Sequence, residues 1–249
     1  MADATLFARQ WAGIVAQVRL FGEHGPDATL VEEHGMVAAI MPTVPTSSLM
    51  NVAIAVDPNT PPAGLKQLAH KFRAAGAEKW GLWVHPHDKQ AADRALEQGM
   101  CLDSRPAAMV ANLGELPFDD APANQPPDLA AVGRVNDLAY GFSEAKLGPA
   151  IGSLPDSVLT YGAVHGQEIA SVAMAFDVGT DTAVWFVATL PHARRRGLSR
   201  QALQRLLLDA RARGQETASL QASAAGQPVY EPLGFTSVGS VHLYEERFS

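Results

Sequence analysis

Three consecutive arginines and a glycine stand where an apolar run gives way to a helical pattern, in LPHARRRGLSRQAL, Leu190 to Leu203. A strand that leads into a helix leaves the first helical N–H groups without intrahelical acceptors, and these groups attract anions. Gly197 lets the backbone approach a bulky anion closely. Guanidinium groups that can bind phosphate oxygens follow one another at Arg194, Arg195 and Arg196. The stretch therefore predicts a pyrophosphate-binding site, and the alternative is a solvated basic helix start that opposes the helix dipole.

The composition is that of a globular protein whose main partner is neither a nucleic acid nor a membrane. The chain has 249 residues, of which 47% are hydrophobic and 18% charged, and its formal net charge is −7. The first twenty residues do not follow the pattern of a signal peptide, and no apolar run is long enough to span a bilayer. Cys101 is the only cysteine, so we expect no internal disulfide, no cysteine metal cluster and a cytoplasmic location.

The elements that must position the arginine stretch occur twice in the chain. Each half has two apolar runs of a predicted β-hairpin, Met36 to Pro58 and Ile169 to Pro191. A helical pattern, an apolar strand, a short helical segment and a last strand follow in each half. The order β-β-α-β-α-β, with a helix ahead of each copy, indicates a tandem duplication. We predict one domain over residues 1–117, a proline-rich linker over 118–127 and a second domain over 128–249.

The two copies differ at the junction between hairpin and helix. The first copy reads VDPNTPPAGLKQL and contains no arginine there. Its prolines, Pro58, Pro61 and Pro62, lack the backbone donors that a phosphate would use. We therefore expect only the second copy to bind an anion.

The second half resembles the GCN5-related N-acetyltransferase (GNAT) superfamily, and the first half resembles a degenerate copy of it. The acetyl-CoA signature of that family is Q/R-x-x-G-x-G/A, and here it begins at Arg194 and continues through Gly197, Leu198 and Ser199. Ser199 replaces the usual glycine or alanine. A late tyrosine followed by Gly-Phe appears in VYEPLGF as Tyr230, and Ser223 stands seven positions earlier, where the family often has asparagine.

The resemblance implies an α/β (α+β) fold of two tandem GNAT-like lobes, each a mixed, mostly antiparallel central sheet flanked by helices. It also implies acetyl-CoA as cosubstrate and no metal. In such enzymes two central strands splay apart and the pantetheine arm fills the gap. Backbone groups of Phe186, Val187 and Thr189 are the ones that would pair with the arm.

The same resemblance implies a direct attack of an amine on the thioester. A strand N–H near Val187 would hold the carbonyl oxygen, and Tyr230 would act as general acid for the departing thiolate. Spacing alone favours a packing tyrosine at Tyr230, and it is the position of YEPLGF after the arginine stretch that favours catalysis. Asp181 and Glu168 are candidate general bases acting through water, but we interpret both as solvent-facing turn residues, and His192 as a surface residue.

Two function classes remain open from the sequence. The first is an acetyl-CoA-dependent N-acetyltransferase acting on a small-molecule or peptide amine, with Tyr140 and Phe142 as candidates either for an apolar acceptor pocket or for core packing. The second is a protein that binds acyl-CoA without turning it over. His85 and His87 are interpreted as loop residues and not as a metal site. The sequence leaves a homodimer open.

Overall fold

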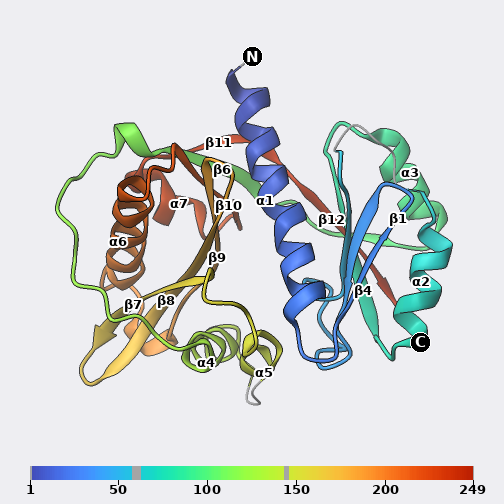
Figure 1. Cartoon of the computed structure of the whole chain (residues 1–249), viewed down its shortest axis with the longest axis horizontal. Helices are drawn as coiled ribbons and strands as arrows, with labels where there is room; N and C mark the ends of the chain where they lie inside the picture. Colours follow the sequence, from blue (N-terminus) through green and yellow to red (C-terminus); the bar gives the residue numbers. More distant parts are fainter. Residues whose placement is uncertain (1, 58–62, 143–145, 249) are drawn as a thin grey trace.

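The chain folds into two six-stranded sheets (Figure 1). The structure is a computed structural model that describes residues 2–57, 63–142 and 146–248. The strands of the first half are β1 (Thr29–Glu33), β2 (Met36–Ile40), β3 (Val52–Ala55), β4 (Lys79–Val84), β5 (Cys101–Ser104) and β6 (Ala107–Asn112). Those of the second half are β7 (Leu159–His165), β8 (Glu168–Val178), β9 (Asp181–Thr189), β10 (Thr217–Ala222), β11 (Phe235–Ser240) and β12 (His242–Arg247).

The two sheets have the same strand order. One sheet runs β1-β2-β3-β4-β12-β5 and the other β7-β8-β9-β10-β6-β11, so each strand of one sheet has a counterpart in the other. Among the described strands only β3 with β4 and β9 with β10 pair in parallel, and every other pair is antiparallel. This confirms the predicted fold of two lobes, each built on a mixed, mostly antiparallel sheet. The predicted hairpins are confirmed as β2 with β3 and β8 with β9; Pro58, Pro61 and Pro62 lie outside the described residues.

The two halves exchange their last strands. β6 belongs to the first half but lies between β10 and β11, and β12 belongs to the second half but lies between β4 and β5. The exchanged strands begin next to each other, where the N–H of Val241 donates to the carbonyl of Pro106 over 3.0 Å. We call this point the crossing. The domain boundaries at 117 and 128 stay a prediction about the units of the chain, because sheet membership runs across them.

Helix α1 (Ala2–His24) lies between the two sheets and packs against strands of both (Figure 1). Its apolar residues recur at helical spacing, and this face is buried at Phe7, Trp11, Ile14, Val15, Val18 and Phe21. The indole N–H of Trp11 donates to the carbonyl of Ala55 over 3.0 Å and so fixes α1 to the first sheet. The helix therefore shares one large hydrophobic core with the two lobes.

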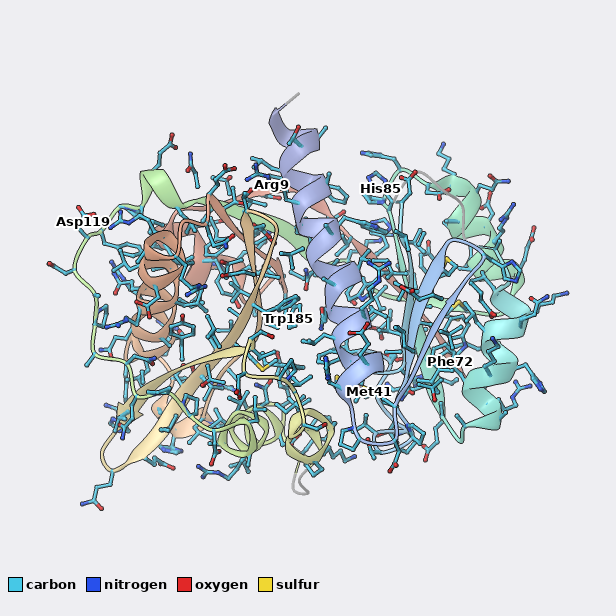
Figure 2. The ribbon with its side chains drawn as sticks, in the orientation of Figure 1. Arg9, Met41, Phe72, His85, Asp119 and Trp185 are labelled. Atoms are coloured by element: carbon cyan, nitrogen blue, oxygen red, sulfur yellow. The ribbon has the colours of Figure 1, made fainter. Side chains whose placement is uncertain are left out.

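The remaining helices flank the sheets. Those of the first lobe are α2 (Leu65–Ala74) and α3 (Lys89–Glu97), and those of the second are α4 (Leu129–Ala139), α5 (Leu147–Ile151), α6 (Leu198–Ala212) and α7 (Gln227–Tyr230). Under α2, Phe72 stacks on Trp80 with ring centroids 4.8 Å apart and forms a second core (Figure 2). Single turns of 3-10 helix span Leu113–Glu115, Pro191–Ala193 and Glu231–Leu233. No helix in the described ranges is long and apolar enough to cross a membrane.

Candidate functional site

The parallel strands β9 and β10 separate after three paired residues. Thr217, Ala218 and Ser219 pair with the first three residues of β9. Within the described strands no further pair joins them, although β10 runs on to Ala222 and β9 to Thr189. Backbone donors and acceptors on the facing edges therefore remain available to another extended chain. We call this opening the splay.

The first lobe is closed at the equivalent place. β4 and β10 are each six residues long, and each lies against its exchanged strand over its full length. β4 pairs with β3 at its third, fourth and fifth residues, Gly81 to Trp83. The counterparts of the fourth and fifth residues on β10 are Leu220 and Gln221, which have no pair on β9. Within the described strands, the parallel pairing therefore ends earlier along β10 than along β4, and the second lobe leaves the longer strand edges unpaired.

A β-bulge lies on the β9 side of the splay. Phe186 and Val187 both stand opposite Ala173, because the β8–β9 register shifts between Val172 and Met174. Phe186 has a φ of 47°, which is uncommon for a bulky residue. The side-chain amide of Asn136 on α4 donates to the carbonyl of Phe186 over 3.1 Å. The contact holds the bulge in a conformation that re-aims the next backbone groups.

Asn136 was not predicted as a site residue. It is 4% exposed and lies on the buried face of α4, beside Val132 and Val135. A polar side chain at an apolar helical position was the available signal, because a buried amide needs hydrogen-bond partners.

The arginine stretch forms the turn between β9 and α6, at the open end of the splay. Gly197 is the residue before α6 and has a φ of 75°, a left-handed conformation that suits glycine. Leu198 is buried and anchors the first turn of α6, while Ser199 is half-buried. The first N–H groups of the helix have no intrahelical acceptors and point out of its N-terminus.

The three arginines have different surroundings. The guanidinium of Arg194 donates to the carbonyl of Ala139, at 2.7 Å, and to that of Thr189, at 3.3 Å. It therefore fastens the end of α4 to the end of β9. Arg195 and Arg196 are exposed, and no ion pair is recorded for them among the described side chains. They are the arginines best placed to meet an anion.

Tyr230 ends the short helix α7, which follows β10. Its ring meets the edge of Phe235 at a centroid distance of 5.9 Å. Within the described part of the chain no hydrogen-bond partner is recorded for its hydroxyl, so the expected backbone acceptor of a packing tyrosine is not found. Burial raises the pKa of Tyr230 above its ordinary value, and the nearby phenol of Tyr140 raises it further. The hydroxyl therefore carries its proton at neutral pH.

The other predicted residues around Tyr230 have mixed positions. Ser223, just after β10, accepts a hydrogen bond from the N–H of Gly226 over 3.2 Å and so stabilises the turn into α7. Tyr140 and Phe142, at the end of α4, are 70% and 46% exposed, so the core-packing interpretation of these two is wrong. They are exposed because α4 ends at Ala139 and the chain turns outward there.

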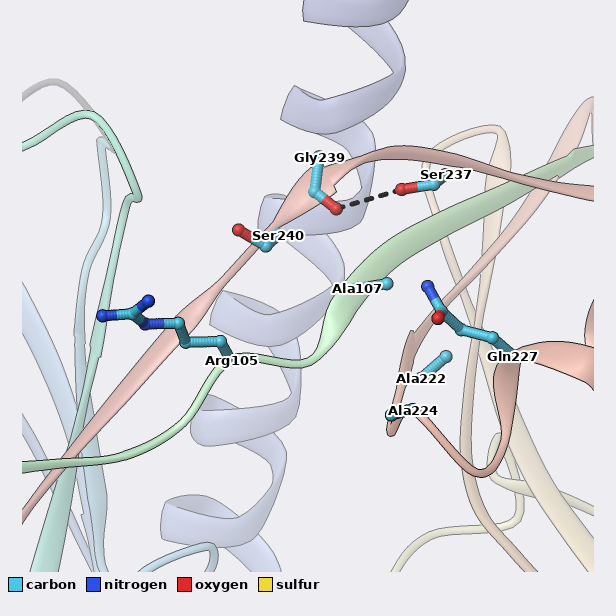
Figure 3. A pocket seen from close by; sticks show the side chains of 8 residues that line it. All are labelled: Arg105, Ala107, Ala222, Ala224, Gln227, Ser237, Gly239 and Ser240. Atoms are coloured by element: carbon cyan, nitrogen blue, oxygen red, sulfur yellow. Dashed lines mark hydrogen bonds between the residues drawn. The ribbon is translucent and has the colours of Figure 1, made fainter.

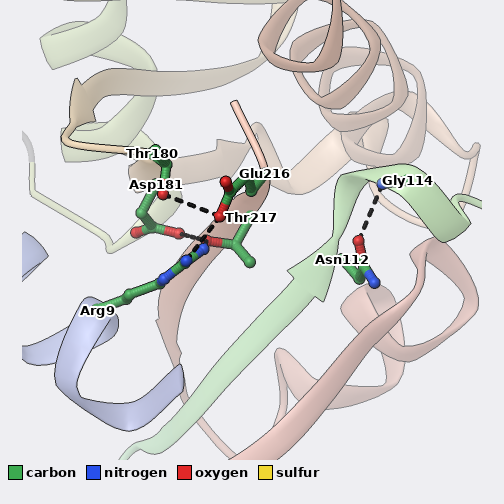
Figure 4. A network of polar contacts seen from close by, with 7 residues as sticks. All are labelled: Arg9, Asn112, Gly114, Thr180, Asp181, Glu216 and Thr217. Carbon is green, nitrogen blue, oxygen red and sulfur yellow. Dashed lines mark hydrogen bonds and ion pairs between the residues drawn. The ribbon is translucent and has the colours of Figure 1, made fainter. Parts of the chain in front are cut away.

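Asp181 is not the solvent-facing turn residue that the sequence suggested. It is 1% exposed and opens β9 at the closed end of the splay. One carboxylate oxygen accepts from the hydroxyl of Thr217 over 2.6 Å (Figure 4). The other accepts from the hydroxyl of Ser219, also over 2.6 Å. Burial raises the pKa of Asp181 despite these hydrogen bonds. With both oxygens engaged at the end remote from Tyr230, Asp181 is a structural residue.

Glu168 and His192 lie together on the surface. The carboxylate of Glu168 is 2.9 Å from the imidazole of His192, and both side chains are more than 40% exposed. The pair therefore matches the expectation of surface residues. Over the described ranges no group of three or more histidine, cysteine or acidic side chains is arranged to hold a metal ion.

Two cavities lie at opposite ends of β10. A cavity of about 690 Å³ lies at the start of the strand, lined by Arg9 and Glu216, whose ion pair of 2.6 Å belongs to the network in Figure 4. A second cavity, of about 280 Å³, lies at the carboxyl end of the strand beside the crossing, and it is lined by Ala222 of β10 and Gln227 of α7. We call it the crossing cavity.

Comparisons with known proteins agree with this geometry. Residues 136–235 match the Acetyltransferase (GNAT) family. The fold is similar to that of a GCN5-related N-acetyltransferase from Kribbella flavida, with a TM-score of 0.65, 20% identity and 96% of each chain covered. Among curated proteins none matches the sequence significantly.

Two further solved structures cover nearly the whole chain. One is a putative acetyltransferase from the GNAT family of Novosphingobium aromaticivorans, with a TM-score of 0.62, 17% identity and coverage of 96% of this chain and 97% of the other. The other is a GCN5-related N-acetyltransferase from Sphaerobacter thermophilus, with a TM-score of 0.59, 16% identity and coverage of 99% and 93%. Both lobes therefore belong to a fold arrangement that other proteins share.

Proposed function

Because residues 136–235 match the Acetyltransferase (GNAT) family, we propose that the protein is an acetyl-CoA-dependent N-acetyltransferase. It moves the acetyl group to a primary amine of a small-molecule or peptide acceptor by direct attack. The observation that carries the proposal is the splay, which opens between a bulged strand and the segment that bears Tyr230 and which the first lobe lacks.

The residues around the splay fit the parts of acetyl-CoA. The N-terminus of α6, with Gly197, Arg195 and Arg196, suits the pyrophosphate, because backbone N–H groups and guanidinium groups both donate to phosphate oxygens. The edge of β9 at Phe186, Val187 and Thr189 suits the amide-containing pantetheine arm. The carbonyls of Phe186 and Thr189 already accept from Asn136 and Arg194, and each has a second lone pair for the arm. Arg194, Leu198 and Ser223 support the walls of this site, through the contacts described above, and Ser199 lies in the first turn of α6.

The bound cosubstrate supplies an activated acetyl group as a thioester. The amine nitrogen forms a bond to the acetyl carbon, the carbon–sulfur bond breaks, and one proton passes in net from the nitrogen to the sulfur. The bulge directs the N–H of Val187 to the carbonyl oxygen as negative charge develops there. Tyr230 gives its proton to the sulfur, and positioning of the two reactants supplies a further share of the rate.

The first lobe has a supporting role in this proposal. Its parallel strands are paired where the splay would open, and its junction lacks arginine. It nevertheless contributes β6, the strand that joins β10 to β11 and so supports the segment of Tyr230. A cytoplasmic location goes with the proposal, since the single cysteine gives the chain no use for an oxidising compartment.

A binder of acyl-CoA without turnover is the second candidate. It is favoured by one observation, that both candidate bases are engaged elsewhere: Asp181 with two hydroxyls and Glu168 with His192. An amine that gives its proton to water needs neither Asp181 nor Glu168 as a general base. The enzyme therefore remains the better supported function.

Turnover separates the two candidates. The purified chain is titrated with acetyl-CoA by calorimetry and then incubated with acetyl-CoA and a panel of amines that includes alkylamines, polyamines, amino acids and peptides. The acetylated products are quantified by mass spectrometry, because the exposed Cys101 reacts with reagents that detect free thiol. Binding with acetylation supports the enzyme, binding without acetylation of any amine supports the second candidate, and absence of binding refutes both.

A further inference from the structure

Three basic side chains gather at the crossing and have no carboxylate partner. Arg105 lies in the link between β5 and β6, His242 opens β12, and His87 follows β4. His242 pairs with Val84 at the end of β4 and follows Val241, which is bonded to Pro106, so His242 lies near both other residues. Burial lowers the pKa of His242, and the charges of Arg105 and His87 lower it further. No ion pair is recorded for Arg105 within the described ranges. We call these residues the basic cluster.

Arg105 has no carboxylate partner among the described side chains although the chain is acidic, as is the case for Arg195 and Arg196 at the splay. The formal net charge is −7, and arginines on other surfaces meet carboxylates, as Arg213 meets Asp177 over 2.8 Å and Arg211 meets Asp119 over 3.0 Å. No carboxylate of the described side chains forms an ion pair with Arg105. The guanidinium therefore remains available to an anion from solution.

The crossing cavity connects the basic cluster with the segment of Tyr230. Arg105 lines one end of the cavity and Gln227 the other, with Ser240 between them (Figure 3). Figure 3 shows the side chain of Gln227 reaching toward β6, while the guanidinium of Arg105 extends toward the first sheet. Gln227 and Tyr230 are three positions apart in α7 and so lie on the same side of that helix.

We propose that the crossing cavity is the acceptor site and that the acceptor amine carries an anionic group, a carboxylate or a phosphate, which Arg105 binds. The proposal rests on the proposed function. The amine lies beside Tyr230, and the anionic group lies at the other end of the cavity, so the two are separated by a spacer. The guanidinium fork matches a carboxylate or a phosphate with two parallel hydrogen bonds. The cavity suits a small molecule.

This assignment gives the first lobe a direct part in recognition. The link between β5 and β6 belongs to the first half of the chain, and it brings Arg105 to a cavity whose other wall, with Ala222 and Gln227, comes from the second half. The exchange of strands is what brings these groups together, because Arg105 precedes β6 directly.

The test uses the full chain and two matched series of amines. One series consists of straight-chain ω-amino acids from glycine to 6-aminohexanoate, and the other of neutral n-alkylamines of the same lengths, with O-phosphoethanolamine as the phosphate-bearing probe. The kcat/KM of each amine is measured at saturating acetyl-CoA. Arg105→Gln removes the charge at an exposed position, and Arg134→Gln on the exposed side of α4 is the matched control.

We expect the wild type to prefer anionic amines with an optimum spacer length. Arg105→Gln should lower their kcat/KM about 10-fold or more, since hydrogen bonds to charged groups are the stronger ones. It should leave neutral amines, Arg134→Gln and the Kd of acetyl-CoA nearly unchanged. The relative loss for amino acids and for O-phosphoethanolamine tells which anion is bound.

Other outcomes overturn the proposal. If neutral amines are acetylated and anionic ones are not, or if Arg105→Gln affects both series equally, the anion site is refuted while the proposed function stands. If no amine of any kind is acetylated, the proposed function fails and the acceptor site fails with it.

Discussion

Replacing the hydroxyl of Tyr230 tests the proposed chemistry most directly. Tyr230→Phe keeps the ring that packs on Phe235 and removes only the proton donor. Because no partner of the hydroxyl is recorded among the described residues, the change removes no hydrogen bond of the usual net value, about 0.5–1.5 kcal/mol. One kcal/mol shifts the Tm of a protein of this size by about 2–4 °C, so we expect a smaller shift than that.

The expected loss of rate follows from the acidity of the phenol. General acid catalysis is typically worth about 10²–10⁴-fold. Burial raises the pKa of Tyr230 above its ordinary value, whereas a thiol titrates near about 8.5, so proton transfer to the thiolate is uphill. We therefore expect kcat to fall by about 10², the lower end of that range, which corresponds to about 2.7 kcal/mol.

The assay measures kcat and the Kd of acetyl-CoA for wild type and Tyr230→Phe with the best amine of the panel. The Kd should stay within about twofold, because the phenol is assigned to proton transfer and not to binding. The kcat of the wild type should also hold through pH 9, since its acid titrates higher. Full turnover by Tyr230→Phe would mean that the proton comes from water or another residue, and the role given to Tyr230 would be wrong.

Gly197→Val should weaken acetyl-CoA binding by about 10-fold. The left-handed φ of 75° costs a β-branched residue about 1–3 kcal/mol, so the turn shifts away from the conformation that presents its N–H groups to the pyrophosphate. An unchanged Kd by calorimetry would contradict this. Asp181→Asn should keep turnover. Since burial raises the pKa of Asp181, its charge opposes folding above the unfolded pKa, so the variant should match or exceed wild-type Tm at pH 7 and gain less at pH 4. The pKa of His242 is lowered in the folded protein, so the unfolded chain binds more protons below about pH 6.5, and the free energy of unfolding decreases as the pH is lowered. His242→Gln should make this decrease smaller, which urea unfolding between pH 7 and pH 5 measures.

Periodicity was sufficient to predict the elements whose buried faces are regular. The apolar positions of α2 and α6 are buried as their spacing indicated, and so is the face of α1. The predicted order has four strands in each half, whereas the structure describes six. β1 and β7 were missed, and the single last strand predicted for each half is two strands, β5 with β6 and β11 with β12. β1 alternates between half-buried and exposed residues at a sheet edge, so its apolar signal is weak.

The exchange of β6 and β12 could not be read from the sequence. Either strand has the same alternation whether it completes its own sheet or the other one, and only the crossing at Pro106 and Val241 distinguishes the two cases. Asp181 was misjudged for a related reason. Its position in a turn-like sequence suggested solvent, whereas the hydroxyls that pair with it come from β10, more than thirty positions away.

For the candidate site, the sequence predicted the position of the arginine turn but not which arginine binds backbone carbonyls and which two stay exposed. Arg194 is held by backbone carbonyls from α4 and β9, and no local pattern predicts such a contact between distant segments. The roles of Tyr230 and of the cosubstrate-binding residues stay predictions until the assays above are done.

The exchanged strands also set the order in which the chain can finish folding during synthesis. The indole N–H of Trp80 on β4 donates a hydrogen bond to the carboxylate of Glu246 on β12 over 2.8 Å, and the two residues are 166 positions apart in the sequence. β4 therefore leaves the ribosome long before its neighbour exists, and its edge stays open to wrong partners in the meantime. β10 has no such delay, because β6 is already made when β10 emerges. The lobe that carries the splay can thus close its sheet first, and the supporting lobe is completed last.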